Sequence, residues 1–460
     1  MSPHDAQKPI GRTRVHAIRE PVNSGDALAA PRRHGVTCAA ASLAALMLLV
    51  AIAVAPLQAR AEPLALPVGP QVGDQDISPF YRWTQTLPAR PGVMLREEPM
   101  PAQTEITGAG LAQRILYTST DVRWHAGIVP VSGTLYLPKG EPPAGGWPLV
   151  AWAHGTLGVS DRCAPSWTGH KPRDATYIER WIENGFAVVA TDYQGLGGPG
   201  PHPYLIWEAE GRSVLDGVRA ALAAHSGKLT HKVFISGQSQ GSGAALGATI
   251  IAPSYAPDVP LLATVATGLV STFPNGPYHP PQATAIGSPI YVSLMMLGGA
   301  IPDGAPSPDA MATDKGKLLL KAAREGCTAE MRGVARQEGI ETDDAYVEPI
   351  AKIEAGLTHV TDMPAVRLPV PVLLGTGLAD STLAPTRQFG AVSAFCAAGS
   401  DVVWKTYPGT THNGGVNASF PDALSFFREV LEGRKPQSNC SSIAEPGAPG
   451  TPAPGIAFND

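Results

Sequence analysis

The sequence predicts an α/β protein with a mostly parallel sheet, helices on both faces of that sheet and an inserted helical cap. Three observations support this prediction. Short apolar runs alternate with amphipathic stretches up to residue 269, a pattern typical of βαβ units. The same alternation returns over residues 364–434. The intervening segment, 270–363, breaks the pattern and is far longer than an ordinary connection of about 4–6 residues, so we expect it to form the cap.

Residues 1–61 have the features of an export signal. An apolar, Ala/Leu-rich stretch covers 36–56, two arginines precede it, and residues 59–61 offer an A-x-A cleavage site. We therefore expect cleavage near Ala61 and a secreted, periplasmic or extracellular mature chain. An uncleaved membrane anchor is the alternative, because about 20 apolar residues can just span a bilayer.

The charge balance argues against nucleic acid as a partner. The formal net charge of the whole chain is −5. Removing 1–61 takes away seven Lys/Arg and three Asp/Glu, which leaves −5 − 4 = −9. A mildly acidic net charge disfavours binding to the phosphates of nucleic acid.

Four cysteines remain beyond Cys38, which lies in the predicted signal: Cys163, Cys327, Cys396 and Cys440. Export places them in an oxidising compartment, where disulfides persist. Four cysteines allow three pairings, and the spacing alone does not choose among them. Their wide spacing does not suit a zinc site, so we expect no metal and no cofactor.

Residues 62–269 are expected to form an N-terminal arm and the first part of the core. An extended Pro-rich arm over 62–110 comes first, followed by antiparallel strands over 113–120 and 126–137. A buried strand over 148–153 and a helix over 174–184, with Asp174 as its N-cap, come next. The remaining expected elements are a strand over 186–191, a helix over 210–224 and a strand over 261–269.

The stretch that points most directly to chemistry is 232–252, KVFISGQSQGSGAALGATIIA. Its first apolar residues predict a buried strand, a glycine-rich turn follows, and small apolar residues then begin a helix. A strand, G-x-S-x-G and a helix in this order form the nucleophile elbow of α/β-hydrolases, in which a sharp turn exposes the serine hydroxyl. Ser239 is therefore the candidate nucleophile. The alternative is a glycine-rich turn that only allows close packing.

Within the cap, 315–338 reads as one charged amphipathic helix. The residues from Leu294 to Leu297, with Ile286 and Ile290 nearby, are apolar enough to line an acyl pocket that favours longer chains. It is at least as plausible that they only pack the cap.

The second part of the core, 364–434, supplies the remaining alternation. Its expected elements are strands over 370–376 and 401–407 and helices over 384–396 and 421–432. The C-terminal tail, 435–460, is rich in Pro, Gly and Ser, and we expect it to be loose apart from Cys440.

A serine nucleophile needs a base and an acid that orients the base, and this fold supplies them in the order Ser, Asp, His. His412 follows the strand at 401–407 in a Gly-rich loop, which is the expected place for the base. His359 lies in the cap region and reads as a surface or packing residue. Asp380 follows the strand at 370–376 and is the candidate acid, although Asp is also a common N-cap.

Two backbone N–H groups are expected to bind the oxyanion. Gln240 follows the nucleophile and begins the helix, so its N–H points toward the reacting carbonyl. The second donor should come from the loop after the strand at 148–153, where Gly155 or Thr156 can supply it. His154 reads as structural, because Ser239 needs only one base.

With these residues in place, the chain resembles the secretory lipases of the lipase A type, over most of residues 79–432. Beyond the elbow, Asp380 and His412, the resemblance depends on Pro79-Phe80-Tyr81, on Pro91-Gly92-Val93-Met94-Leu95-Arg96, on Asp161-Arg162-Cys163-Ala164-Pro165-Ser166, on Thr191-Asp192-Tyr193-Gln194-Gly195-Leu196-Gly197 and on His202-Pro203-Tyr204. It implies an α/β-hydrolase core with a helical cap, hydrolysis of carboxylic esters, and disulfides Cys163–Cys327 and Cys396–Cys440. Fungal members carry an acidic residue near the position of Gly155, so their acyl preference does not transfer.

The expected function is therefore a secreted serine carboxylester hydrolase, a lipase or esterase that forms an acyl-enzyme. The expected partner is a small-molecule or lipid ester, with contact to a lipid interface if the substrate is a lipid. The oligomeric state stays open. The alternatives are a serine peptidase of the same fold and a non-catalytic, hydrolase-like binding protein.

Overall fold

The computed structural model describes residues 65–460, except 102–103, 105 and 281–286. The predicted export signal and Ile286 lie outside the described residues. No helix of the described chain combines the length and the apolar character that a membrane span requires.

Nine strands of the described chain form one sheet in the order β1-β2-β3-β5-β4-β6-β7-β8-β9. Their bounds are β1 Met94–Pro99, β2 Ala109–Thr120, β3 Ile128–Pro138, β4 Trp147–Ala153, β5 Ala187–Thr191, β6 Leu229–Gln238, β7 Leu261–Thr267, β8 Val372–Gly377 and β9 Val402–Tyr407. The pairs from β1 to β5 are antiparallel, and those from β5 through β4 to β9 are parallel. The prediction of a mostly parallel sheet is confirmed.

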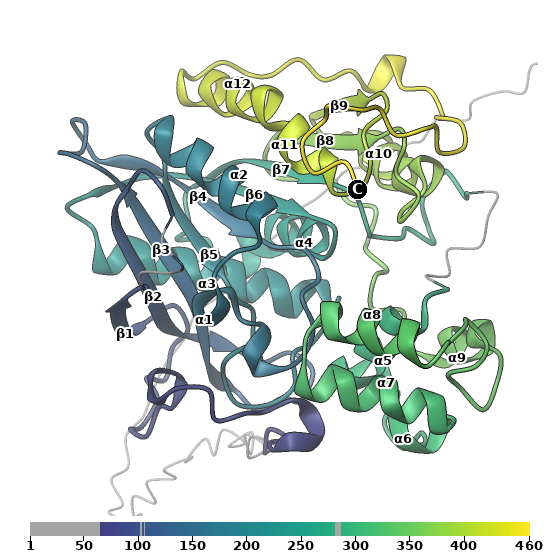
Figure 1. The fold of residues 1–460 in the computed structure, drawn as a ribbon. Coiled ribbons are helices and arrows are strands. Elements are labelled where there is room, and N and C mark those ends of the chain that lie inside the picture. Colours follow the sequence, from purple (N-terminus) through teal and green to yellow (C-terminus); the bar gives the residue numbers. More distant parts are fainter. Residues whose placement is uncertain (1–64, 102–103, 105, 281–286) are drawn as a thin grey trace, which may run out of the picture. The chain divides into compact units, whose positions relative to one another are not determined.

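The helices of the core alternate with the parallel strands along the chain or follow β9, and they are labelled in Figure 1. Their bounds are α1 Pro165–Thr168, α2 Pro172–Glu183, α3 Trp207–Ala224, α4 Gln240–Tyr255, α10 Pro385–Ala397, α11 Gly414–Ala418 and α12 Phe420–Leu431.

Alternating side chains of the strands pack against different helices, so that both faces of the sheet are covered. Along β4, Leu149 and Ala151 belong to one apolar cluster, together with residues of α3 and α4. The alternate residues of the same strand, Val150 and Trp152, belong to another cluster with residues of α2 and α12. This period of two is the ordinary alternation of a strand, and both clusters are almost fully buried.

Helices also fill the chain between β7 and β8, where the sequence predicts the cap. They are α5 Pro289–Met295, α6 Pro308–Met311, α7 Asp314–Glu325, α8 Thr328–Gln337 and α9 Ile350–Gly356. They share an apolar core of their own, which residues of the core loops such as Tyr204 and Leu205 join. The single helix predicted over 315–338 is wrong, because the chain becomes extended at Gly326 and Cys327 between α7 and α8.

Two further expectations for the core are corrected. The arm predicted over 62–110 contains a strand that was not expected, because β1 pairs antiparallel with β2 at the edge of the sheet. Asp174 is not an N-cap. Helix α2 begins at Pro172, which suits a first helical position, and Asp174 is buried in its first turn against Arg173.

The prediction of a loose C-terminal tail is also wrong. The Asn439 side chain exchanges two hydrogen bonds with the backbone of Trp404 in β9. Further along, the Asn459 amide donates to the carbonyl oxygens of Gly409 and Ala453, and its oxygen accepts the N–H of Thr411. The tail therefore packs against the loop that holds His412.

Candidate functional site

Ser239 lies between β6 and α4 with φ of 57°, a conformation that is rare for a residue with a side chain. Its N–H donates to the Thr267 carbonyl oxygen of β7 at 3.0 Å, which helps to hold the turn. A Cβ on Gly237 would collide with the Gly241 backbone, and a Cβ on Gly241 would collide with Ala153 of β4. The two glycines are thus required by close approach, and they allow the sharp turn that strains Ser239.

Asp380 and His412 come from different loops and meet at one hydrogen bond. His412 Nδ1 lies 2.7 Å from Asp380 Oδ2. Asp380 is almost fully buried, and its other oxygen accepts the backbone N–H groups of Thr382 and Leu383. The Gln388 amide, 2.8 Å away, also donates to Oδ2. This carboxylate is held in one orientation and in turn orients the imidazole ring.

Ser239 and His412 line the same cavity, which has a volume of about 430 Å³. The ring of His412 packs over Gly268, where a Cβ would lie 2.8 Å from Cε1. No hydrogen bond joins the Ser239 and His412 side chains among the contacts of the described residues. Such bonds are often long in unliganded hydrolases and shorten when substrate binds.

Both expected oxyanion donors lie beside Ser239. Gln240 is the first residue of α4, where helical N–H groups have no intrahelical acceptor. Gly155 follows β4 and lines the same cavity as Ser239. A second, smaller cavity of about 40 Å³ also borders Ser239, together with Gln240 and Thr156 among others.

The side chain of Gln240 is held by hydrogen bonds to two buried residues, Glu210 and His202. Its amide nitrogen lies 2.7 Å from Glu210 Oε1 and 2.7 Å from His202 Nε2. His202 Nδ1 faces the Gln194 carbonyl oxygen, so Nδ1 carries the proton and Nε2 accepts from Gln240. Burial lowers the pKa of His202 to about 3 and raises the pKa of Glu210 to about 8.

His154 and His359 border neither of the two cavities at Ser239. His154 is fully buried, with Nδ1 2.8 Å from the Gly155 carbonyl oxygen, and burial lowers the pKa of its imidazole. It packs against Tyr193, in keeping with a structural role. His359 is exposed and borders a different cavity, beside Asp362 and Arg387.

The apolar cap residues pack within the cap and away from the two cavities at Ser239. Residues 294–297 are all buried within the apolar cluster of the cap, and Ile290 packs against that cluster. None of them borders either cavity at Ser239. They pack the cap, which is the alternative that the sequence left open.

The sequence analysis missed several residues of the larger cavity. Arg173 of α2 donates from Nε to Asp174 at 2.8 Å and from Nη1 to Asn413 at 2.6 Å, and Asn413 follows His412 directly. Tyr291 and Arg332 of the cap and Phe458 of the tail also border this cavity. Only the position of Asn413 beside His412 gives a signal in the sequence.

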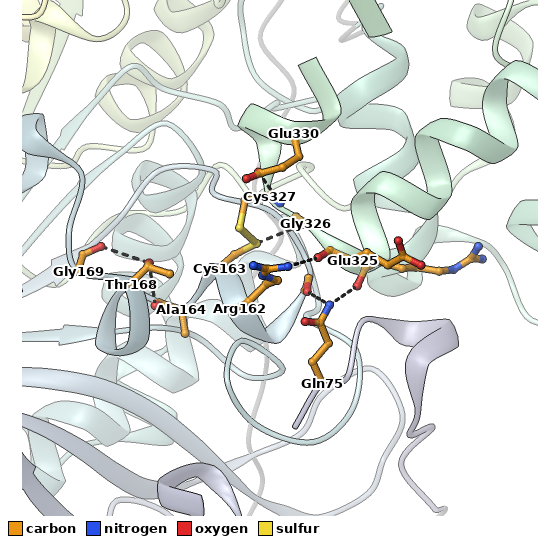
Figure 2. Close-up of a disulfide and its surroundings, with 12 residues drawn as sticks. Gln75, Arg162, Cys163, Ala164, Thr168, Gly169, Glu325, Gly326, Cys327 and Glu330 are labelled. Carbon is orange, nitrogen blue, oxygen red and sulfur yellow. Dashed lines mark hydrogen bonds between the residues drawn. A yellow bond between two sulfur atoms is a disulfide. The ribbon is translucent and has the colours of Figure 1, made fainter. Parts of the chain in front are cut away.

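The four cysteines of the described chain form two disulfides, Cys163–Cys327 and Cys396–Cys440, the pairs that the family resemblance implies. In Figure 2 the first joins a loop of the core to the start of α8 in the cap. The Gln75 amide donates nearby to Ser160 Oγ and to the Arg324 carbonyl oxygen. The cap is thus attached to the core covalently and by hydrogen bonds.

Comparison with known proteins places this geometry in a family. The sequence model of the family described as secretory lipase matches residues 164–439. Lipase A of Moesziomyces aphidis is 24% identical over 311 residues, which cover 62% of this chain and 61% of that relative. The chain thus aligns with about three fifths of the length of this curated relative.

Solved structures agree on the fold. The closed state of Candida antarctica lipase A superposes with a TM-score of 0.59 and 19% identity, over 82% of this chain and 91% of that chain. A rice cell wall degrading esterase, LipA of Xanthomonas oryzae, superposes with a TM-score of 0.54 and 18% identity, over 75% of this chain and 100% of that chain. At these identities the likeness shows the α/β-hydrolase fold.

Proposed function

We propose, because this chain belongs to the secretory lipase family, that it hydrolyses carboxylic esters with Ser239 as the nucleophile. One observation carries the proposal. A strained elbow serine shares a cavity with His412, whose ring is held by the buried Asp380. This is the geometry of a serine nucleophile, a general base and an orienting acid.

In this mechanism Ser239 Oγ attacks the carbonyl carbon of the ester while His412 Nε2 takes the hydroxyl proton. Asp380 holds Nδ1–H and stabilises the imidazolium that forms. The backbone N–H groups of Gln240 and Gly155 bind the developing oxyanion. His412 then protonates the leaving alcohol, and the same residue activates the water that releases the acid from the acyl-enzyme.

The proposed substrate is a small-molecule or lipid ester, and the family likeness supports a lipase or an esterase. The similar proteins include a lipase A and a cell wall degrading esterase, so both activities are represented among them. We also propose that the mature chain is exported after cleavage near Ala61. The two disulfides agree with an oxidising compartment.

The alternatives are less well supported. A binding protein of this fold would usually lack a member of the triad, and here all three residues are present. A peptidase remains the second candidate, and a peptide amide assayed beside the ester separates the two.

The proposal is tested with the exported chain and p-nitrophenyl acetate. Ser239→Ala should lower kcat by about 10⁴-fold or more with an unchanged melting temperature. Ser254→Ala, an exposed serine on the same helix, is the matched control and should keep wild-type turnover. Near wild-type turnover by Ser239→Ala would show that the nucleophile is another residue.

A further inference from the structure

Two cavities of different size border Ser239. We propose that the enzyme prefers short-chain acyl esters of hydroxyl-bearing alcohols. This inference rests on the proposed function and adds the substrate class to it.

The position of His412 decides which cavity holds which half of the ester. The base must protonate the oxygen of the leaving alcohol, so that oxygen lies on the His412 side of Ser239. His412 borders the cavity of about 430 Å³ and is not among the residues that border the cavity of about 40 Å³. The alcohol therefore occupies the larger cavity, and the acyl chain occupies the smaller one.

The smaller cavity limits the length of the acyl chain. Its volume is about 40 Å³, and one water-sized group needs roughly 10–15 Å³ of such volume. It thus has room for about three such groups, enough for a short acyl chain. Leu205, Val270 and Leu383 bound it, and Leu205 and Leu383 also pack in the apolar cluster of the cap.

The cap is attached to the core by a disulfide and a hydrogen bond near Thr156. The Cys163–Cys327 disulfide joins core and cap, and the Thr328 N–H of α8 donates to the Leu157 carbonyl oxygen at 2.8 Å. Leu157 lies one residue beyond Thr156, which borders both cavities. These attachments hold the start of α8 beside the loop that contains Gly155 and Thr156.

The larger cavity contains a donor and an acceptor placed for a hydroxyl group. Gln238 is 1% exposed, and its Oε1 has no hydrogen-bond partner in the described structure. Its Nε2 donates to the His412 carbonyl oxygen at 3.1 Å, which fixes the amide so that Oε1 must be the free atom. A buried acceptor without a partner is costly, so this atom calls for a donor from the ligand or from water.

Arg173 supplies the matching donor. Its Nε and Nη1 bind Asp174 and Asn413, while no hydrogen bond of Nη2 appears among the described contacts. A Cβ placed on Gly155 would lie 2.7 Å from Gln238 Oε1 and 3.4 Å from Arg173 Nη2, so both atoms lie directly beside this glycine, which also borders the larger cavity.

A hydroxyl group can accept from Nη2 and donate to Oε1 at once. A carboxylate can accept a hydrogen bond from the arginine but has no proton to donate to Oε1. An alkyl group can form a hydrogen bond with neither atom. The pair therefore selects a hydroxyl close to the scissile ester.

The test compares glycerol 1-monoacetate with propyl acetate, which differ by two hydroxyl groups on the same three-carbon alcohol. Wild-type enzyme should give a kcat/KM at least 10-fold higher for the monoacetate, as expected for a hydrogen bond to a charged donor. Arg173→Lys keeps a cation beside Asp174 but removes Nη2, and it should reduce this preference about 10-fold, mainly through KM. Arg180→Lys is the control on the same helix, because Arg180 binds the Asn417 carbonyl oxygen and does not border the cavity.

A second comparison tests the acyl side, with p-nitrophenyl acetate and p-nitrophenyl octanoate. The acetate should have the higher kcat/KM. Equal turnover of the two alcohol esters by wild type, an unchanged preference in Arg173→Lys, or faster octanoate turnover would each overturn the inference while Ser239-dependent ester hydrolysis still stands. Ester turnover that survives Ser239→Ala would instead overturn the proposed function.

Discussion

Ser239, His412 and Asp380 could be proposed as a triad from the sequence because each follows a strand, and the carboxyl ends of parallel strands meet at one edge of the sheet. The elbow glycines add a steric signal, since a side chain at Gly237 or Gly241 would collide with the neighbouring backbone. Arg173 and Gln238 carry no such signal. Their roles depend on which of their atoms are left without partners, and that follows only from the packed structure.

At the scale of single residues, the proposed orienting role of Asp380 predicts that its replacement by asparagine lowers catalysis. Asp380→Asn keeps the shape of the side chain but replaces an oxygen acceptor by an amide that stabilises the wrong imidazole tautomer. We expect kcat for p-nitrophenyl acetate to fall by about 10⁴-fold. Asp401→Asn, a residue paired with Lys435, is the control. A loss below 10-fold in Asp380→Asn would assign the orienting role to another acceptor.

At the scale of elements, strands and helices of the core could be predicted from apolar patterns, because β4 is a short continuous apolar run and α3 has an apolar face with a period of 3.6. The edge strand β1 was missed because its side chains are half exposed and show little alternation. The break between α7 and α8 was missed because charged residues continue on both sides of Gly326. The tail was misjudged because its ordering depends on single side chains such as Asn459.

The contact between α3 and the elbow gives a prediction on pH. Glu210 of α3 is fully buried against Gln240, and burial raises its pKa to about 8 from an ordinary 4.5. Between these values the unfolded chain releases the proton and the folded chain keeps it. The unfolding free energy of wild type should therefore decrease as pH rises from 4.5 to about 8, by a few kcal/mol from this group alone.

Glu210→Gln isolates this effect, because its amide oxygen can still accept the hydrogen bonds of Gln240 and Leu205. The stability of the variant relative to wild type should rise across that pH window, measured by urea unfolding at several pH values. The exposed Glu338→Gln serves as control. A difference between Glu210→Gln and wild type that stays constant from pH 4.5 to 9 would contradict a buried, protonated Glu210.

At the scale of the whole molecule, cap and core share apolar packing and hydrogen bonds, and the Cys163–Cys327 disulfide links the two covalently. It closes a loop of 164 residues, whereas Cys396–Cys440 closes one of 44. In the chain-entropy account the longer loop gives the larger stabilisation, about 4–5 kcal/mol.

Replacing Cys163 and Cys327 together by serine should thus destabilise the protein more than replacing Cys396 and Cys440, as measured by thermal unfolding. Because the first pair also holds the cap near the oxyanion loop, its loss should raise the relative turnover of octanoate. The second double variant should leave the chain-length profile unaltered. The opposite order, in stability and in chain-length profile, would show that the cap is held by packing and hydrogen bonds alone.

The central claim is that Ser239 is the nucleophile of an ester hydrolase, and covalent labelling tests it most directly. Wild-type protein is treated with a fluorophosphonate, which phosphonylates activated serines, and the modified peptide is located by mass spectrometry. We predict one label per chain, on Ser239, that is lost in Ser239→Ala and strongly slowed in His412→Ala. A label on another serine, or stoichiometric labelling of the Ser239→Ala chain, would contradict the account.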